Sequence, residues 1–362
     1  MFVLTILMLH LGTARCFSWD IVVGGVTQLD FFYNGTLTHT EDIPSAHCIT
    51  SLSYDPVHYR LLITDFTYYG QTTSICSFNL SAMNIQPLLS IRASDYYMRV
   101  VYDPVTQFLF WKNAFGLYSF SLNPVSPNTT GNGSLLVMLD NYCFDIVVDS
   151  CGGYIYWITD KEIERARLDG SDREVLIKSW VWVRLSLAID QHAQKIYWID
   201  IPYSDKEIFM KSANLDGKNR TTLHILRNTS DFLAHTLAVT KDFIYWIDEE
   251  RMEIWTLQKN KTEDRLYSNI SSVCSLCHRV AANYTIEELI QGPKSCSPQG
   301  MITNDSKECT GSICQNHCLE GDCSVNVEQP LKVAVVLGNG VKSTFASTIV
   351  NVYLLFYTYF IH

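Results

Sequence analysis

A short aromatic motif recurs along the chain, and this repetition limits the possible fold more than any other feature. Three copies are nearly identical: Tyr156-Trp157-Ile158-Thr159-Asp160, Tyr197-Trp198-Ile199-Asp200 and Tyr245-Trp246-Ile247-Asp248. Weaker copies stand upstream, at Phe31-Phe32-Tyr33-Asn34, Leu62-Ile63-Thr64-Asp65 and Phe110-Trp111-Lys112-Asn113. The copies start at residues 31, 62, 110, 156, 197 and 245, so every interval after the first lies between 41 and 48 residues. A period of this length indicates a repeat architecture.

Two further landmarks repeat with the motif. Asp55, Asp103, Asp149 and Asp190 each stand seven residues before an aromatic start, and Leu-Asp-Gly recurs at 168–170 and 215–217. Both residue types favour turns, because Asp bonds the nearby backbone and Gly allows positive φ. Each unit therefore predicts four short strands, which make one propeller blade. We expect an all-β, six-bladed propeller with Tyr and Trp buried between blades and the N-terminal strand completing the last blade.

The motif and its turns resemble a known family. Tyr-Trp-Ile-Asp, with LDGSDREVLI at 168–177 and NLDGKNRTTL at 214–223, is similar to the YWTD β-propeller, the class B repeat of the low-density lipoprotein receptor family. The resemblance covers residues 18–275 and is closest to an insect member, through the opening Ser18-Trp19-Asp20-Ile21. It implies that Tyr and Trp pack between blades and that Asp hydrogen-bonds across them. By position these structural roles fall to Tyr156, Trp157, Tyr197, Trp198, Asp200, Tyr245, Trp246 and Asp248.

Both ends of the chain are apolar. Residues 1–16 combine an apolar run with small residues, which is typical of a secretory signal peptide. Residues 343–362 contain no Lys, Arg, Asp or Glu, and twenty such residues are about enough to span a bilayer. We expect membrane attachment through this segment. A spanning helix and a glycolipid anchor attached near Gly338-Asn339-Gly340 both remain open, as does a segment packed on a core.

The chain has twelve cysteines, a number that favours an oxidising compartment. Cys143 and Cys151 flank one predicted strand, whose length of some 26 Å places them too far apart to pair with each other. Residues 276–328 form a cysteine-rich region, in which we expect disulfides rather than zinc. The segment Cys314-x3-Cys318-x4-Cys323 resembles part of an epidermal-growth-factor-like module. That resemblance implies a bridge between Cys314 and Cys323.

Ten Asn-x-Ser/Thr acceptor sites indicate a heavily glycosylated, secreted chain. Asn34 belongs to a copy of the aromatic motif, so we expect it to lie in the core and to carry no glycan. The expected glycosylation sites are Asn79, Asn128, Asn132, Asn219, Asn228, Asn260, Asn269, Asn283 and Asn304.

Charge and motifs limit the possible functions. The net charge is −10, and no Lys/Arg stripe provides the cations that a nucleic-acid groove needs. The sequence lacks the serine-hydrolase, zinc-protease and phosphate-loop signatures, so we expect no enzyme activity, cofactor or metal. The favoured interpretation is a cell-surface receptor-like or adhesion protein whose propeller binds an extracellular protein, with a possible co-receptor and, through the insect resemblance, a role in germ-cell development. The alternative is a calcium-dependent, lactonase-like hydrolase with three or more carboxylates around the central channel.

Overall fold

The computed structural model describes most of the repeat region and one later segment. The described residues are 18–67, 72–92, 99–113, 116–122, 129–130, 133–159, 161–178, 183–201, 207–227, 236–248, 251–270, 279–282, 333–337 and 341–345. The expected signal peptide at residues 1–16, the expected bridge between Cys314 and Cys323, and residues 346–362 of the apolar segment lie outside them. The chain divides into two units, Met1–Leu319 and Glu320–His362. The described residues contain no helix that is long and apolar enough to cross a bilayer.

The first unit contains six antiparallel sheets of four strands, one of which gains a short fifth strand. From the innermost to the outermost strand, the first three sheets are β25 (Arg279–Ala282), β1 (Ile21–Gly24), β2 (Gln28–Tyr33) and β3 (Thr36–Asp42); β4 (Ile49–Asp55), β5 (Arg60–Thr67), β6 (Thr72–Asn79) and β7 (Asn84–Arg92), with β11 (Thr129–Thr130) beside β7; and β8 (Arg99–Asp103), β9 (Phe108–Lys112), β10 (Gly116–Ser121) and β12 (Ser134–Met138). The other three are β13 (Cys143–Asp149), β14 (Tyr154–Thr159), β15 (Glu162–Arg167) and β16 (Glu174–Lys178); β17 (Val183–Asp190), β18 (Lys195–Ile201), β19 (Ile208–Asn214) and β20 (Thr221–Arg227); and β21 (Leu237–Val239), β22 (Phe243–Asp248), β23 (Glu253–Gln258) and β24 (Asp264–Asn269).

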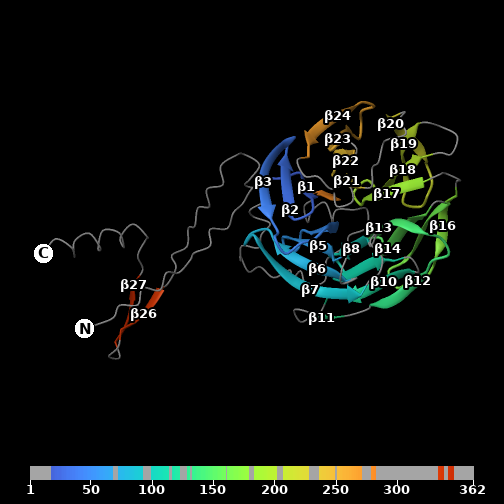
Figure 1. The fold of residues 1–362 in the computed structure, drawn as a ribbon. Coiled ribbons are helices and arrows are strands. Elements are labelled where there is room, and N and C mark those ends of the chain that lie inside the picture. The colour runs from blue at the N-terminus through green and yellow to red at the C-terminus, as the bar shows by residue number, and fades with distance from the viewer. Residues whose placement is uncertain are drawn as a thin grey trace. The chain divides into compact units, whose positions relative to one another are not determined.

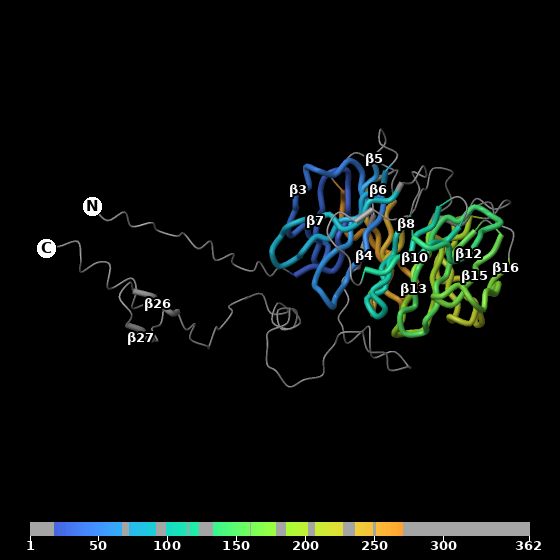
Figure 2. The backbone as a smooth tube through the Cα atoms, turned by 90° about the horizontal axis from the view of Figure 1, so that it is seen from below, coloured from blue at the N-terminus to red at the C-terminus, as the bar shows by residue number. Residues whose placement is uncertain are grey.

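The six sheets follow one another around a ring in chain order (Figure 1). Their innermost strands form a closed circle, in which each contacts the next: β25, β4, β8, β13, β17, β21 and β25 again. The strands run between the two open faces of the ring, which we call its ends, so the turns gather at those ends (Figure 2). This arrangement is the predicted six-bladed, all-β propeller.

The ring closes through strands from both ends of the repeat region. The C-terminal strand β25 pairs with β1, with Ile21 opposite Ala282 and Gly24 opposite Arg279. It thereby supplies the innermost strand of the first blade, whereas the last blade, β21 to β24, is complete without the N-terminus. The expected closure by an N-terminal strand is therefore confirmed, but it occurs in the sheet that β25 shares with β1 to β3 and not in β21 to β24. The propeller extends to Ala282, beyond the boundary at residue 275.

Five of the six aromatic copies lie in the second strand of their sheets, namely β5, β9, β14, β18 and β22. The copy at residues 31–34 does not, because Phe31 and Phe32 belong to β2, the third strand. The second strand of this blade is β1, Ile21–Gly24, which carries no aromatic residue. Assigning Phe31-Phe32-Tyr33-Asn34 to the repeat was therefore wrong. The error explains the one short interval, since this copy stands a strand later in its blade than the others.

The core lies between the blades. Trp157, Trp198 and Trp246 expose at most 2% of their surface. Trp198 packs against Tyr156 of the preceding blade, whereas its neighbour Tyr197 packs against Trp246 of the following blade. Successive side chains of a strand point to opposite faces of the sheet, so one aromatic pair fills two interfaces.

The outermost strand of every blade is irregular. Its pairing with the third strand contains a register shift in each blade. These shifts lie at Phe31/Phe32, Ile75/Cys76, Leu117/Tyr118, Ile163/Glu164, Met210/Lys211 and Ile254/Trp255. Such bulges twist an exposed edge and disfavour pairing with another chain. In the second unit, β26 (Val333–Leu337) and β27 (Val341–Phe345) form an antiparallel hairpin.

Candidate functional site

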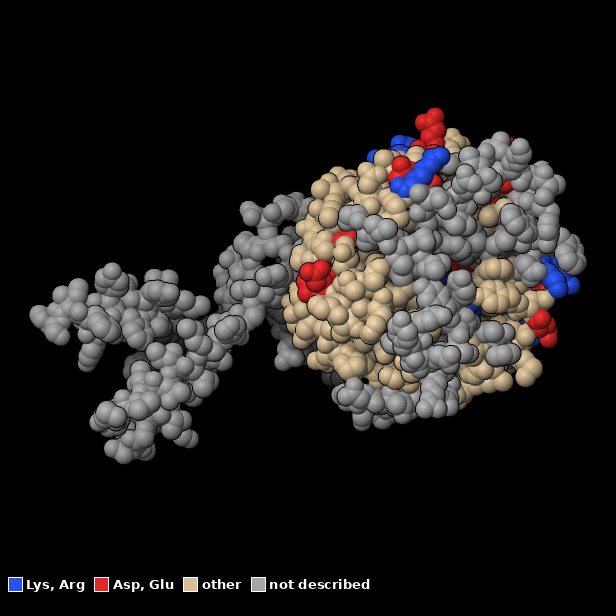
Figure 3. All heavy atoms as spheres, viewed as in Figure 1, with Lys and Arg blue, Asp and Glu red and all other residues tan. Residues whose placement is uncertain are grey.

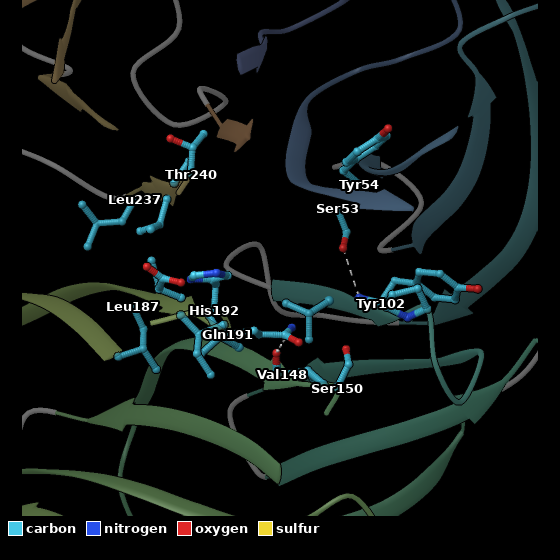
Figure 4. Close-up of a pocket in the computed structure, with 18 of the residues that line it drawn as sticks. Ser53, Tyr54, Tyr102, Val148, Ser150, Leu187, Gln191, His192, Leu237 and Thr240 are labelled. Carbon is cyan, nitrogen blue, oxygen red and sulfur yellow. Dashed lines mark hydrogen bonds between the residues drawn. The ribbon is translucent and has the colours of Figure 1, made fainter. Parts of the chain in front are cut away.

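A cavity of about 220 Å³ lies among the innermost strands. Its lining includes residues from five of the innermost strands: Leu52 and Ser53 of β4, Val101 of β8, Val147 of β13, Leu187 and Ile189 of β17, and Leu237 and Val239 of β21. Figure 4 shows Ser53, Leu187, Gln191 and Leu237 around one open space. The walls are mainly apolar, and the turns after the innermost strands add polar groups. A concave, mostly apolar space with a few polar groups is the usual form of a binding site.

The repeated Asp residues stand at the ends of the innermost strands, and their carboxylates hold the turns that follow. The Asp55 carboxylate accepts hydrogen bonds from the backbone N–H of Val57 and the side chains of His58 and Arg60. Burial by itself raises the pKa of Asp55, but the His58 hydrogen bond and the nearby charge of Arg60 outweigh it and lower the pKa. The side chain is fully buried, so it is a structural carboxylate.

The equivalent carboxylates have similar partners. Asp103 accepts from Val105 N at 3.0 Å and Thr106 Oγ1 at 2.5 Å, and Asp149 accepts from Gly152 N at 2.9 Å. Thr240 takes this position in the last blade, where its Oγ1 accepts from Phe243 N at 3.2 Å. The sequence identified these Asp positions correctly as turn residues.

Asp190 is the only acidic residue that lines the described part of the cavity, and it is already paired. Its Oδ2 bonds Lys259 Nζ from the next blade, which also donates to the carbonyl oxygen of Thr240 at 2.5 Å. Across the described residues no group of three or more His, Cys, Asp or Glu side chains is placed to hold a metal ion. The described lining thus lacks the carboxylate cluster that would favour a calcium-dependent hydrolase.

One polar atom of the cavity has no partner. Gln191 Oε1 is buried without a hydrogen bond, while Gln191 Nε2 makes a long one, 3.5 Å, to the carbonyl of Val148 (Figure 4). A buried acceptor without a donor is costly. Gln191 therefore carries an unsatisfied buried oxygen beside the cavity.

The aromatic residues singled out from the sequence are structural. Tyr156, Tyr197 and Tyr245 expose at most 3% of their surface. The Tyr156 hydroxyl donates across the blade boundary to the carbonyl oxygen of Leu215 at 3.3 Å. Burial raises the pKa of Tyr156 to about 12. These residues hold the blades together and do not line the cavity.

The motif aspartates are also buried. Asp200 pairs with Lys211 in its own sheet at 2.9 Å, and Asp248 accepts from Arg251 N at 3.3 Å. In the second blade the equivalent Asp65 accepts from the backbone N–H groups of His47 and Cys48. In the second blade the motif carboxylate thus ties the segment entering the blade to its second strand.

Sequence reasoning missed several contacts between blades. Asp145 Oδ2 accepts from Ser186 Oγ at 3.0 Å and Leu187 N at 2.9 Å in the next blade. Arg173 and Arg220, which follow the two Leu-Asp-Gly turns at the same spacing, donate to the carbonyl oxygens of Met138 and Leu176 in the preceding blades. The shared Leu-Asp-Gly-x-x-Arg spacing was the signal for these two arginines, whereas nothing repeated marks Asp145.

The described cysteines fall into two classes. Cys48 and Cys151 are disulfide-bonded, whereas Cys76 and Cys143 are free thiols. Cys143 and Cys151 therefore do not pair with each other, as the strand length predicted. Burial raises the pKa of the Cys143 thiol to about 12, which makes it a poor nucleophile.

The described surface of one end of the ring is mainly uncharged. Figure 3 shows few Lys, Arg, Asp or Glu side chains on this face, and most of them lie near its periphery. No basic stripe crosses the visible described area. A neutral end face suits contact with another protein better than contact with nucleic acid.

Comparison with known proteins agrees with the resemblance seen in the sequence. The chain is 24% identical over 255 residues to Protein cueball of Drosophila yakuba and 27% identical over 265 residues to that of Drosophila virilis. These matches cover 67% and 69% of this chain but only 38% and 40% of the relatives. A shorter match, 169 residues at 30% identity, is to Protein cueball of Drosophila persimilis. No family model matches the chain.

A solved structure gives the same fold. A chain in the crystal structure of a nidogen/laminin complex superposes with a TM-score of 0.59 at 14% identity, covering 74% of this chain and 99% of that one. The predicted resemblance to YWTD β-propellers, and within them to the insect protein cueball, is therefore confirmed.

Proposed function

We propose that this chain is a non-enzymatic, receptor-like or adhesion protein that acts outside the cell and binds a protein ligand through its propeller. The main support for the proposal is the structural role of the repeated acidic residues. Asp55, Asp103 and Asp149 cap turns, and Asp190 pairs with Lys259. The repeat thus supplies scaffolding, and the ends of the ring are the surfaces available for recognition.

The cysteines support an extracellular location. Cys48 and Cys151, which both belong to the propeller, are disulfide-bonded. Structural disulfides persist in secreted and surface proteins and are rare in the reducing cytosol. The ten acceptor sites and the apolar residues 1–16 of the sequence agree with entry into the secretory pathway.

The relatives support a protein ligand. The superposed propeller comes from a complex of nidogen with laminin, and that complex motivates a protein partner here. Membrane attachment through residues 343–362, a co-receptor and a role in germ-cell development complete the proposal. They rest on the apolar sequence and on the similarity to cueball, of which the matched segment covers 38%.

The test uses the full chain on intact insect cells. A membrane-impermeant biotin reagent is expected to label it, and antibody-directed proximity labelling is expected to enrich cell-surface or matrix proteins. A chain that only permeabilised cells expose to the reagent would contradict the extracellular role. Release by a phosphoinositide-specific lipase would distinguish a glycolipid anchor from a spanning helix. Calcium-dependent lactone hydrolysis by the purified chain would instead favour the hydrolase.

A further inference from the structure

Four of the ten N-glycosylation acceptor sites follow the register of the blades. Thr36 and Thr221 are the first residues of the outermost strands β3 and β20, and each closes an acceptor site that begins two residues earlier, at Asn34 and Asn219. Ser134, the first residue of β12, closes a third acceptor site in the same way. Asn260 stands in the turn before β24, the outermost strand of the last blade. An acceptor site therefore repeatedly precedes the outer edge of a blade.

The turn geometry leaves these asparagines accessible. Asn34, Asn219 and Asn260 are all exposed. Asn34 and Asn219 adopt positive φ, 47° and 53°, in the turns that lead into β3 and β20. Our expectation that Asn34 lies in the core was wrong, because the residue occupies the turn between β2 and β3 rather than a second strand. Nothing in its position prevents glycosylation.

The strands after these turns have an exposed edge. In the described residues β3, β20 and β24 pair on one side only. Each also presents an aliphatic side chain to solvent: Leu37 is 46% exposed, Ile225 48% and Leu266 46%. An unpaired strand edge with apolar side chains is a template for pairing with another chain.

The fourth blade offers an internal comparison. Its outer strand β16 exposes Val175 by 39%, yet no acceptor site precedes it. Asp172, whose φ is 53°, occupies the place that Asn219 holds in the fifth blade, and Arg173 and Glu174 follow. Charged residues are another way to protect an edge strand. An acceptor site or a group of charged residues thus lies before or at the start of each of these four edge strands, β3, β16, β20 and β24.

We propose that N-linked glycans at Asn34, Asn219 and Asn260 cover the outer edges of their blades and prevent a second copy of the chain from pairing there. A glycan is bulky and hydrophilic, so beside a strand it blocks the close approach that backbone pairing requires. This inference rests on the proposed extracellular function, since only the secretory pathway attaches such glycans. It leaves the ends of the ring, and not its rim, for a partner.

The test begins with glycopeptide mass spectrometry of the full chain purified from insect cells. We expect glycan at Asn34, Asn219 and Asn260. Absence of glycan from all ten acceptor sites would contradict the extracellular function as well. Glycan elsewhere but not at these three sites would overturn this inference alone.

The second step removes the three glycans without adding a charge. The triple variant Asn34→Gln, Asn219→Gln and Asn260→Gln eliminates the three acceptor sites and keeps the side chains neutral. Light scattering is expected to show about a doubling of molar mass for this variant as edges pair. The variant Asn304→Gln, which removes an acceptor site outside the propeller, is the control and should match the unmodified chain. A triple variant that stays monomeric would overturn the shielding role.

A rescue experiment separates edge pairing from general unfolding. Leu37→Lys, Ile225→Lys and Leu266→Lys, added together to the triple variant, place a charge on each edge. The monomer should return, because a lysine on an edge strand disfavours pairing. Continued association, with unchanged circular dichroism, would show that the edges are not responsible.

Discussion

The hydroxyl of Tyr267 donates a 2.6 Å hydrogen bond to the carboxylate of Asp20, and this contact joins the last blade to the beginning of the first. The same carboxylate oxygen accepts from Asn34 N at 2.7 Å. Burial, followed by the hydrogen bond to Asp20, raises the pKa of Tyr267. The side-chain bond therefore reinforces the closure that β25 and β1 make through the backbone.

Removing this hydroxyl should weaken the closure. Tyr267→Phe is expected to lower the free energy of unfolding by about 1.5–3 kcal/mol, the usual range for a hydrogen bond to a charged group. The measurement is chemical denaturation of the full chain. Tyr33→Phe, in a half-buried residue of β2, is the matched control. Equal effects of the two variants would show that the Asp20 bond contributes nothing specific.

Two equivalent tryptophans should respond differently to substitution. Trp157 Nε1 donates to Glu164 at 3.0 Å, whereas Trp198 faces Lys211 at the same register and its buried Nε1 has no partner. Trp157→Phe is expected to cost about 1.5–3 kcal/mol more than Trp198→Phe, because it breaks a hydrogen bond to the buried carboxylate of Glu164, which Arg173 still holds. Thermal denaturation of the two variants measures the difference. A larger loss for Trp198→Phe would contradict the assignment.

Glycines in two turns should differ in their tolerance of a methyl group. At Gly170, with φ +85°, an added Cβ would lie 2.5 Å from the carbonyl oxygen of Leu136 in the preceding blade. At Gly153, with φ +72°, it would meet nothing within 4 Å. Gly153→Ala is expected to cost about 1–2 kcal/mol through backbone strain alone, and Gly170→Ala should cost more because the blades must separate. Equal melting temperatures would argue against close approach at the Leu-Asp-Gly turn.

Alkaline pH should destabilise the protein partly through Tyr156. Burial raises its folded-state pKa to about 12, whereas an unfolded tyrosine titrates near 10. The unfolded chain therefore loses this proton first. The associated stability is fully present below about pH 10 and is lost as pH rises toward 12, by about 2 kcal/mol. Unfolding free energies from pH 9 to 11.5 should fall less steeply in Tyr156→Phe, and parallel curves would contradict the assignment.

The spacing of aromatic residues was sufficient to predict the fold. The number of blades was also right, although one of the six copies from which it was counted stands in the third strand of its blade. Large apolar side chains at successive strand positions, such as Tyr197 and Trp198, require burial on both faces of a sheet. A repeat of 41 to 48 residues satisfies that requirement only when similar sheets stack side by side. The turn role of Asp55 and its equivalents was also local, because Asp bonds the backbone of its own turn.

The place of a strand within its blade depended on the tertiary structure. Phe31 and Phe32 resemble the aromatic pairs of the second strands, but they lie in β2, the third strand of its blade. The place of β2 in the sheet depends on its pairing with β1 and β3. The local sequence does not show which strands it will pair with. For the same reason the sequence misplaced Asn34 and could not identify Asp145 as a link between blades. Local patterns determined which segments are strands and that they must stack. Long-range pairing decided which strand closes the ring, because that choice joins segments from the two ends of the repeat region.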